Sequence, residues 1–271
     1  MSLRINQNID AFNSYRNLSV TDGQMSKSLE KLSSGFRINR AADDAAGLAI
    51  SEGLRAQVGG LKQAVRNAQD GISVVQTAEG ALTESHAILQ RMRDLAVQAS
   101  NEGSQDTTAQ KAADTEYKEL KAELDDIAGK TKFGSTNLLD GTYNKNFQVG
   151  ANVAETLNIT IGDQDSAALG LAGDLTSFAN AQTELGKIDT AIGTVSDTRS
   201  KLGASQNRLE HKINNLNVAV ENLSASESRI RDTDMASEMV SFTRSQILSQ
   251  AGTSMLAQAN HAPQSVLKLL G

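Results

Sequence analysis

Apolar residues recur every three and four positions through the last third of the chain. Steps of three and four from Leu185 reach fourteen positions, of which eleven are apolar, whereas a hydrophobic content of 39% would give five or six. These positions are Leu185, Ile188, Ile192, Val195, Arg199, Leu202, Gln206, Leu209, Ile213, Leu216, Val220, Leu223, Glu227 and Ile230. Such a spacing predicts one long helix over 185–230 with a coiled-coil type of seam.

The first half of the chain carries a matching seam. Nine of its eleven positions are apolar: Leu54, Val58, Leu61, Val65, Ala68, Ile72, Val75, Glu79, Leu82, His86 and Leu89. The stripe then continues through Ile88, Met92, Leu95 and Ala99. Glycines at 53, 59, 60, 71 and 80 weaken this helix in isolation but let a neighbouring backbone approach closely. We expect the helices 54–99 and 185–230 to hold one subunit together.

The middle of the chain changes period. A shorter helix is predicted at about 107–128, with Tyr117, Leu120, Leu124 and Ile127 on one face. Glycines and alternating apolar residues then predict one or two β-hairpins at about 131–165, with strands near 146–149 and 157–161. Residues 163–180 are expected to form a loop or surface excursion.

Both ends of the chain are amphipathic but too sparse to be buried within a compact monomer. We expect 1–44 and 226–271 to form a helical polymerisation domain, mobile in the free chain and folding on association. Residues 45–225 are expected to form a helical rod domain. The apolar positions assigned to the polymerisation helices are Leu3, Ile5, Ile9, Leu18, Leu29, Leu32, Met239, Phe242, Ile247, Leu256 and Leu267.

The predicted fold is therefore mainly α. It is a long antiparallel coiled-coil-like helical bundle from the N- and C-terminal segments, with a small β-hairpin region in the middle. Composition agrees, since one proline and 3% aromatic residues leave the core to Leu, Ile, Val and Ala. The net charge of −6 argues against binding nucleic acid. The uncharged stretch 245–267 is interrupted by polar residues throughout, so no membrane span is expected.

The sequence gives little support for a catalytic, cofactor or metal site. The absence of cysteine excludes disulfides and thiolate sites, and no H-E-x-x-H, Walker-type or G-x-S-x-G motif is present. His86 falls on a seam and is interpreted as buried or partner-facing. Two acidic pairs resemble the start of a calcium loop but lack its remaining ligands: Asp232 with Asp234, and Asp163 with Asp165. We expect no enzyme, cofactor or metal site.

Two other polar features have structural interpretations. Asp43 and Asp44 fit a helix start, where carboxylates complement the helix dipole. Arg199, Gln206 and Glu227 interrupt the second seam, and buried polar seam residues can set register and partner choice.

Several long segments resemble the bacterial flagellins. They include LRINQNIDAFNSYRNL, LEKLSSGFRINRAADDAAGLAISEGLRAQVGGLKQAVRNAQDGISVVQTAEGAL, LQRMRDLAVQASN, FGSTNLLDG, FQVGAN, NLSASESRIRDTDMASEM and SQILSQAGTSMLAQANHAPQSVLKLL. The resemblance covers roughly 1–163 and 180–271. Few residues separate the strands from the last long helix, so the chain resembles a minimal flagellin without large outer variable domains.

The resemblance implies a subunit that polymerises into the extracellular flagellar filament for motility. It also implies partners: further copies of the chain, the flagellar export apparatus, an export chaperone and the filament cap protein, with secretion that uses no cleaved signal peptide. The alternatives are a hook–filament junction protein and a secreted receptor-binding ligand.

The segment from Leu89 to Gln98 resembles the region that the flagellin-sensing Toll-like receptor recognises. By position in the motifs, the resemblance assigns receptor contacts to Arg91, Leu95 and Glu116. Leu95 also belongs to the apolar stripe, so filament packing is a second interpretation of the same surface.

Overall fold

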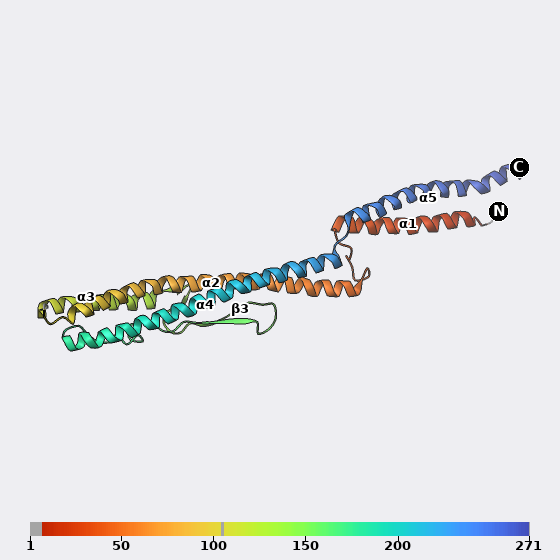
Figure 1. The fold of residues 1–271 in the computed structure, drawn as a ribbon. Helices are drawn as coiled ribbons and strands as arrows, with labels where there is room; N and C mark the ends of the chain where they lie inside the picture. Colours follow the sequence, from red (N-terminus) through yellow and green to blue (C-terminus); the bar gives the residue numbers. More distant parts are fainter. Residues whose placement is uncertain (1–6, 104–105, 271) are drawn as a thin grey trace. The chain divides into compact units, whose positions relative to one another are not determined.

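The computed structural model describes residues 7–103 and 106–270, with side chains described as far as residue 261. It divides into two compact units. The terminal unit comprises Met1–Ala56 and Asn222–Gly271, and the central unit comprises Gln57–Glu221. Two long helices, α2 (Ala45–Ala99) and α4 (Phe178–Arg231), contribute to both units (Figure 1).

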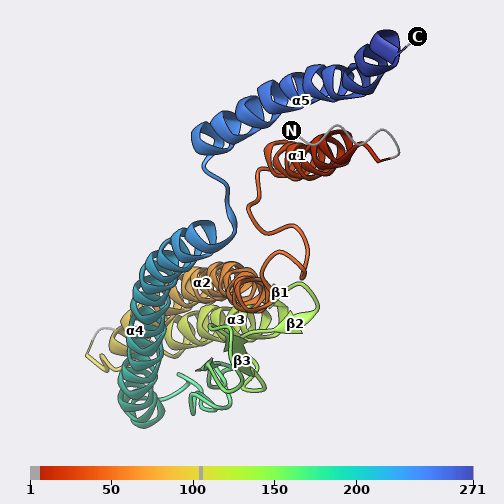
Figure 2. The same cartoon turned by 90° about the vertical axis from the view of Figure 1, so that its right-hand side faces the viewer.

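In the central unit, α2 and α4 run antiparallel and side by side (Figures 1 and 2). An ion pair joins Arg93 Nε to Asp189 Oδ1 at 2.7 Å. A second pair joins Arg199 Nη2 to Glu79 Oε1 at 3.7 Å. Every position of the two predicted seams is buried or half-buried, which confirms both seams. The second helix begins seven residues before the seam does, where the hydroxyl of Ser177 accepts a hydrogen bond from the Asn180 amide.

Helix α3 (Thr107–Lys130) returns antiparallel to α2. It begins where the Asp106 carboxylate accepts hydrogen bonds from the Thr108 and Ala109 amides, which otherwise lack helical partners. Tyr117 and Leu124 are fully buried. The predicted helix at about 107–128 is therefore confirmed, with the expected face inward.

Two hairpins follow. β1 (Lys132–Phe133) pairs with β2 (Thr136–Asn137), and β3 (Asn144–Gln148) pairs antiparallel with β4 (Thr156–Thr160). In β4, Leu157 and Ile159 are buried while the intervening residues are exposed, as strand periodicity requires. The prediction of one or two hairpins is confirmed, with two.

The predicted loop is present over 163–177, where the expectation allowed a loop or a surface excursion over 163–180. It is a loop, but Leu171 and Leu175 are fully buried, so it is not a surface excursion. Two carboxylates of α3 hold it: Asp125 accepts from the Ser166 amide at 2.7 Å and Asp114 from the Leu175 amide at 2.9 Å. Both residues lie far from the loop in sequence, and nothing in the local pattern predicts the attachment.

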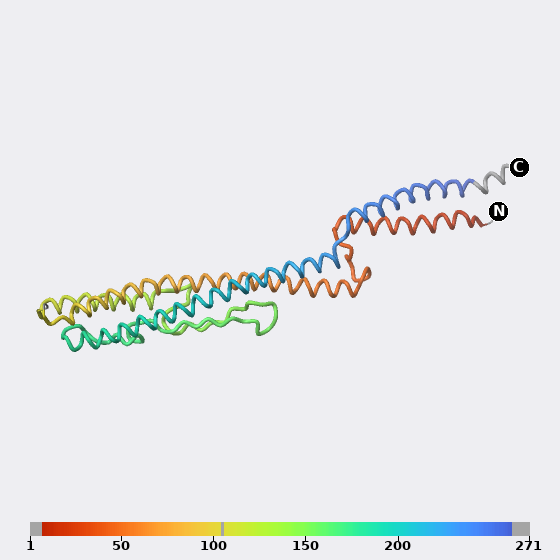
Figure 3. The backbone as a smooth tube through the Cα atoms, in the orientation of Figure 1, coloured from red at the N-terminus to blue at the C-terminus, as the bar shows by residue number. Residues whose placement is uncertain are grey.

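In the terminal unit, α1 (Ile9–Ser34) and α5 (Met235–Leu270) form an antiparallel pair (Figure 3). Ser249 donates to Asp22 at 2.9 Å, and Asn8 donates to the Ala259 carbonyl at 2.7 Å. Asn8 also caps α1 by accepting from the Ala11 amide. The helix ends at Gly35, whose φ of 76° is accessible to glycine at little cost.

The two connecting segments of the terminal unit meet as a short β-bridge between Phe36 and Asp232. The Arg37 amide donates to the Arg231 carbonyl at 2.7 Å, and the Thr233 amide donates to the Gly35 carbonyl at 2.9 Å. The Arg231 guanidinium lies 4.9 Å from the centre of the Phe36 ring. It also forms an ion pair with Glu52.

The acidic residues near these segments cap helices and turns. Asp44 accepts from the Gly47 amide at the start of α2, which confirms the predicted helix start, and Asp234 does the same for α5 through the Ala236 amide. Asp43 instead accepts from the amides of Arg40 and Asn39, and these hydrogen bonds lower the pKa of its carboxyl. Over the described residues, no three His, Cys, Asp or Glu side chains are grouped to hold a metal ion. No helix in that same part of the chain combines the length and apolar character needed to cross a membrane.

Candidate assembly surface

Helix α5 is apolar on two opposite sides. Phe242 and Leu256 are half-buried on the side that faces α1. Val240 and Ile247 lie roughly 140–160° away around the helix from Phe242, at about 100° per residue, and each is 60% exposed. A helix that is apolar all round is normally buried all round. The α1–α5 pair satisfies only one side of α5.

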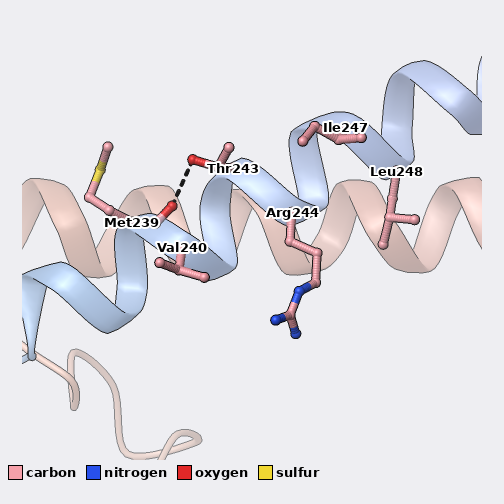
Figure 4. A pocket seen from close by; sticks show the side chains of 6 residues that line it. All are labelled: Met239, Val240, Thr243, Arg244, Ile247 and Leu248. Carbon is pink, nitrogen blue, oxygen red and sulfur yellow. Dashed lines mark hydrogen bonds between the residues drawn. The ribbon is translucent and has the colours of Figure 1, made fainter.

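The exposed side of α5 is hollowed into a shallow groove of about 480 Å³. Its lining is Met239, Val240, Thr243, Arg244, Ile247 and Leu248, drawn in Figure 4. The Thr243 hydroxyl donates to the Met239 carbonyl at 2.8 Å, so it is already satisfied within the helix. The groove therefore presents an apolar floor with one cation, Arg244, beside it.

Helix α1 exposes apolar residues as well. Phe12 is 71% exposed and Tyr15 63% exposed, although the whole chain is only 3% aromatic. Ile9, Val20 and Leu29 are each more than half exposed. Exposed large apolar side chains, in a chain with so few aromatic residues, favour an interaction site on this helix. We call these residues, with the α5 groove, the assembly surface.

The residues assigned to polymerisation helices fall into three groups. Ile9, Leu29, Met239 and Ile247 are exposed. Leu18, Leu32, Phe242 and Leu256 are half-buried. Leu3 and Ile5 lie outside the described residues, and Leu267 lies in α5 beyond the described side chains.

Sequence reasoning missed several members of the assembly surface: Phe12, Tyr15, Val20, Val240 and Leu248. The available signal was the aromatic pair in α1, since Phe12 and Tyr15 lie three residues apart in a chain with few aromatic residues.

The three receptor candidates lie close together but differ in exposure. Arg91 of α2 and Glu116 of α3 form an ion pair at 2.6 Å, and both side chains are about half exposed. Leu95 is only 2% exposed and belongs to the core of the central unit. The exposed chemistry at this place is thus the Arg91–Glu116 pair, while Leu95 packs in the core.

A buried polar cluster near this pair was not predicted. The Tyr117 hydroxyl donates to Glu184 Oε2 at 3.0 Å, and Lys187 Nζ lies 2.6 Å from Glu184 Oε1. Burial raises the pKa of Tyr117 above its ordinary value, and the negative charge of Glu184 raises it further. Both Glu184 oxygens are engaged, so the cluster ties α3 to α4.

The polar seam residues also have structural partners. Arg199 pairs with Glu79, and Gln206 donates to Glu210 one turn along α4. His86 is half-buried in the seam, as expected, with Nε2 3.0 Å from Gln90 Nε2. Glu227 is half-buried.

Comparison with protein families gives two matches. Residues 5–144 match the bacterial flagellin N-terminal helical region, and residues 185–270 match the bacterial flagellin C-terminal helical region. Together the two matched ranges include α1 through β2, most of α4 and all of α5.

Individual relatives agree with the family matches. A flagellin of Bacillus subtilis is 50% identical, with 99% of this chain and 100% of the relative covered. A flagellin of Halalkalibacterium halodurans is 54% identical, with 98% and 99% covered.

Solved structures extend the similarity to the fold. The crystal structure of Bacillus cereus flagellin has a TM-score of 0.50 at 39% identity, covering 56% of this chain and 88% of that one. A Vibrio parahaemolyticus structure, described as a flagellar hook-associated protein, shares the fold at 15% identity with a TM-score of 0.61 over 70% of this chain.

Proposed function

Because this chain belongs to the bacterial flagellin family and is a structural subunit of the extracellular flagellar filament, we propose which of its surfaces build that filament. The proposal assigns polymerisation to the terminal segments 1–44 and 226–271. It assigns to residues 45–225 the role of a rod that sets the shape of each subunit.

The observation that carries this assignment is the second apolar side of α5. Val240 and Ile247 project from α5 away from the side that packs on α1. Burial of apolar surface contributes about 25 cal/mol per Å², so a neighbouring subunit that covers the assembly surface supplies a strong driving force. That force offsets the entropy lost when terminal segments become ordered on association.

The remaining roles follow from family membership. We propose that the chain has no enzymatic activity. We also propose that it is secreted without a cleaved signal peptide, through a flagellar export apparatus with an export chaperone, and adds beneath a filament cap protein. A hook–filament junction role or a stand-alone secreted ligand is not favoured, because flagellins match nearly the whole chain at 50% and 54% identity.

Truncation tests the assignment. Deletion of 1–40 or of 235–271 should each give a soluble, helical chain that forms no filaments in salt, seen by electron microscopy, whereas the full chain polymerises. Helical content by circular dichroism is the control for folding of the remainder. Filaments that grow normally from both truncated chains would contradict the proposal.

A second proposed role is recognition by the flagellin-sensing Toll-like receptor at Arg91, Leu95 and Glu116. The supporting observation is the exposed Arg91–Glu116 ion pair, which offers a partner both a cation and an anion. We assign Leu95 a supporting part, since its side chain is buried in the core of the central unit.

A receptor reporter assay tests the contribution of Arg91 to receptor activation. Arg91→Ala should weaken activation about tenfold, because hydrogen bonds to a charged group contribute roughly 1.5–3 kcal/mol. Arg93→Ala is the matched control, since Arg93 is also exposed on α2 but pairs with Asp189 of α4. Equal activation of the receptor by the wild type and by Arg91→Ala would contradict the proposed role.

A further inference from the structure

Methionines are distributed unevenly between the surface and the core. The chain has six, and three of them lie exposed on α5: Met235 at 47%, Met239 at 49% and Met255 at 61%. Met92, in the core of the central unit, is fully buried. A thioether in a core is shielded, whereas an exposed one meets solutes directly.

The α1–α5 pair leaves all three of these α5 methionines about half exposed or more. Met239 lines the groove (Figure 4), and Met235 precedes it by about one turn. Met255 follows Leu248 by seven residues, so the two lie on nearly the same side of the helix. Met239 is therefore part of the assembly surface, Met255 lies on its continuation along α5, and Met235 is exposed near the start of the same helix.

We propose that Met235, Met239 and Met255 form an oxidation site whose modification by hydroperoxides blocks addition of the free subunit to the filament. This inference rests on the proposed role of the assembly surface. The substrate class is a two-electron oxygen donor, with hydrogen peroxide as the simplest member.

The reaction balances with no further reactant. The thioether sulfur attacks one peroxide oxygen, the O–O bond breaks, and an S–O bond forms. The sulfur is oxidised by two electrons to the sulfoxide, and hydrogen peroxide is reduced by two electrons. The proton of the transferred oxygen passes to the departing hydroxide, which leaves as water.

The product changes the surface that a neighbouring subunit must cover. A sulfoxide is polar and chiral, so it disrupts a methionine-rich apolar contact. Burial of a polar group without a hydrogen-bond partner is unfavourable, which raises the critical concentration about tenfold. Methionines already covered in a filament are shielded, and methionine sulfoxide reductases reverse the change in free subunits.

Peptide mass spectrometry tests the reactivity. Full-length free subunits are treated with hydrogen peroxide, and sulfoxide is followed at each methionine with time. Met235, Met239 and Met255 should react about tenfold faster than Met92, because reactivity follows exposure. Equal rates at Met92 and at the three α5 positions would overturn the proposal, whether or not the chain polymerises.

Seeded polymerisation tests the consequence. For each protein, the critical concentration of treated subunits is divided by that of untreated subunits. The ratio should be about ten or more for the wild type and for the control Met92→Leu, and about one for the triple variant Met235→Leu, Met239→Leu, Met255→Leu. Treatment of the wild type with methionine sulfoxide reductases should return its ratio to one.

Two results separate this inference from the proposed function. Oxidised wild-type subunits that polymerise as well as untreated ones would overturn the inference alone. A triple variant that loses assembly on oxidation as strongly as the wild type would place the sensitivity elsewhere and would also overturn it. Filaments that form from chains truncated at either end would instead contradict the proposed function.

Discussion

The carboxylate of Glu79 on α2 lies 3.7 Å from the guanidinium of Arg199 on α4. Each residue is a polar position in a mostly apolar seam, and the antiparallel register brings the two to the same level. A shift of one helix by a heptad would leave both charges half-buried among apolar residues, which is unfavourable. The pair therefore selects one register of the rod.

Replacement of Glu79 alone should lower the free energy of unfolding, whereas replacement of both Glu79 and Arg199 should not. Glu79→Leu should lower the free energy of unfolding by about 1 kcal/mol, because it leaves Arg199 half-buried without its partner. The double variant Glu79→Leu, Arg199→Leu should be more stable than the wild type by about 1 kcal/mol, since it adds one apolar position to each seam. Urea denaturation measures the free energy of unfolding of the wild type, the single variant and the double variant. A single variant more stable than the double variant would contradict the register role.

Replacement by alanine should change the stability of the chain differently at two glycines of α2. A methyl group at Gly71 would lie 3.2 Å from Leu209 and 3.3 Å from Phe147, whereas nothing lies within 4 Å at Gly80. Gly80→Ala should stabilise the chain by about 1 kcal/mol through helix propensity. Gly71→Ala should gain less or lose stability, because its neighbours must move. Equal gains in urea denaturation would show that α4 and the β3–β4 hairpin do not crowd Gly71.

The seams illustrate what a single sequence can predict. Spacing alone identifies which residues of α2 and α4 face inward, because a long heptad pattern admits one helical face. The burial of Leu171 and Leu175 was not predictable in this way, since it depends on Asp114 and Asp125 of α3, distant in sequence. The assembly surface was predicted only in part, because a scattered apolar position does not reveal which side of a helix pair it occupies.

Alkaline pH should destabilise the central unit through Tyr117. Its pKa is raised in the folded chain by burial, so folding favours the neutral phenol. That contribution is complete below the ordinary tyrosine pKa of about 10 and is lost as pH rises from there toward the higher folded value. The free energy of unfolding should therefore fall more between pH of about 8 and 11 for the wild type than for Tyr117→Phe. An equal fall in both proteins would mean that Tyr117 does not contribute.

The Arg231 contacts should hold the two connecting segments of the terminal unit together. Arg231→Ala removes the contact with Phe36 and the ion pair with Glu52, and a cation–π contact alone contributes about 0.5–2 kcal/mol. Hydrogen exchange at the Arg37 and Thr233 amides should then become about tenfold faster. Arg229→Ala is the matched control, because Arg229 is exposed and donates a hydrogen bond to Ser226 within its own helix. Unchanged hydrogen exchange at these amides in Arg231→Ala would mean that the backbone hydrogen bonds alone stabilise the bridge.

The most direct test of the central claim is the critical concentration for seeded polymerisation of Ile247→Asp. Ile247 and Val218 are exposed to nearly the same extent, 60% and 57%, but Val218 lies on α4 in the central unit. A buried unpaired carboxylate is strongly unfavourable, so Ile247→Asp should raise the critical concentration at least about a hundredfold with unchanged helical content. Val218→Asp should leave it within about twofold of the wild type. Equal critical concentrations for the two variants would contradict assembly through the outward side of α5.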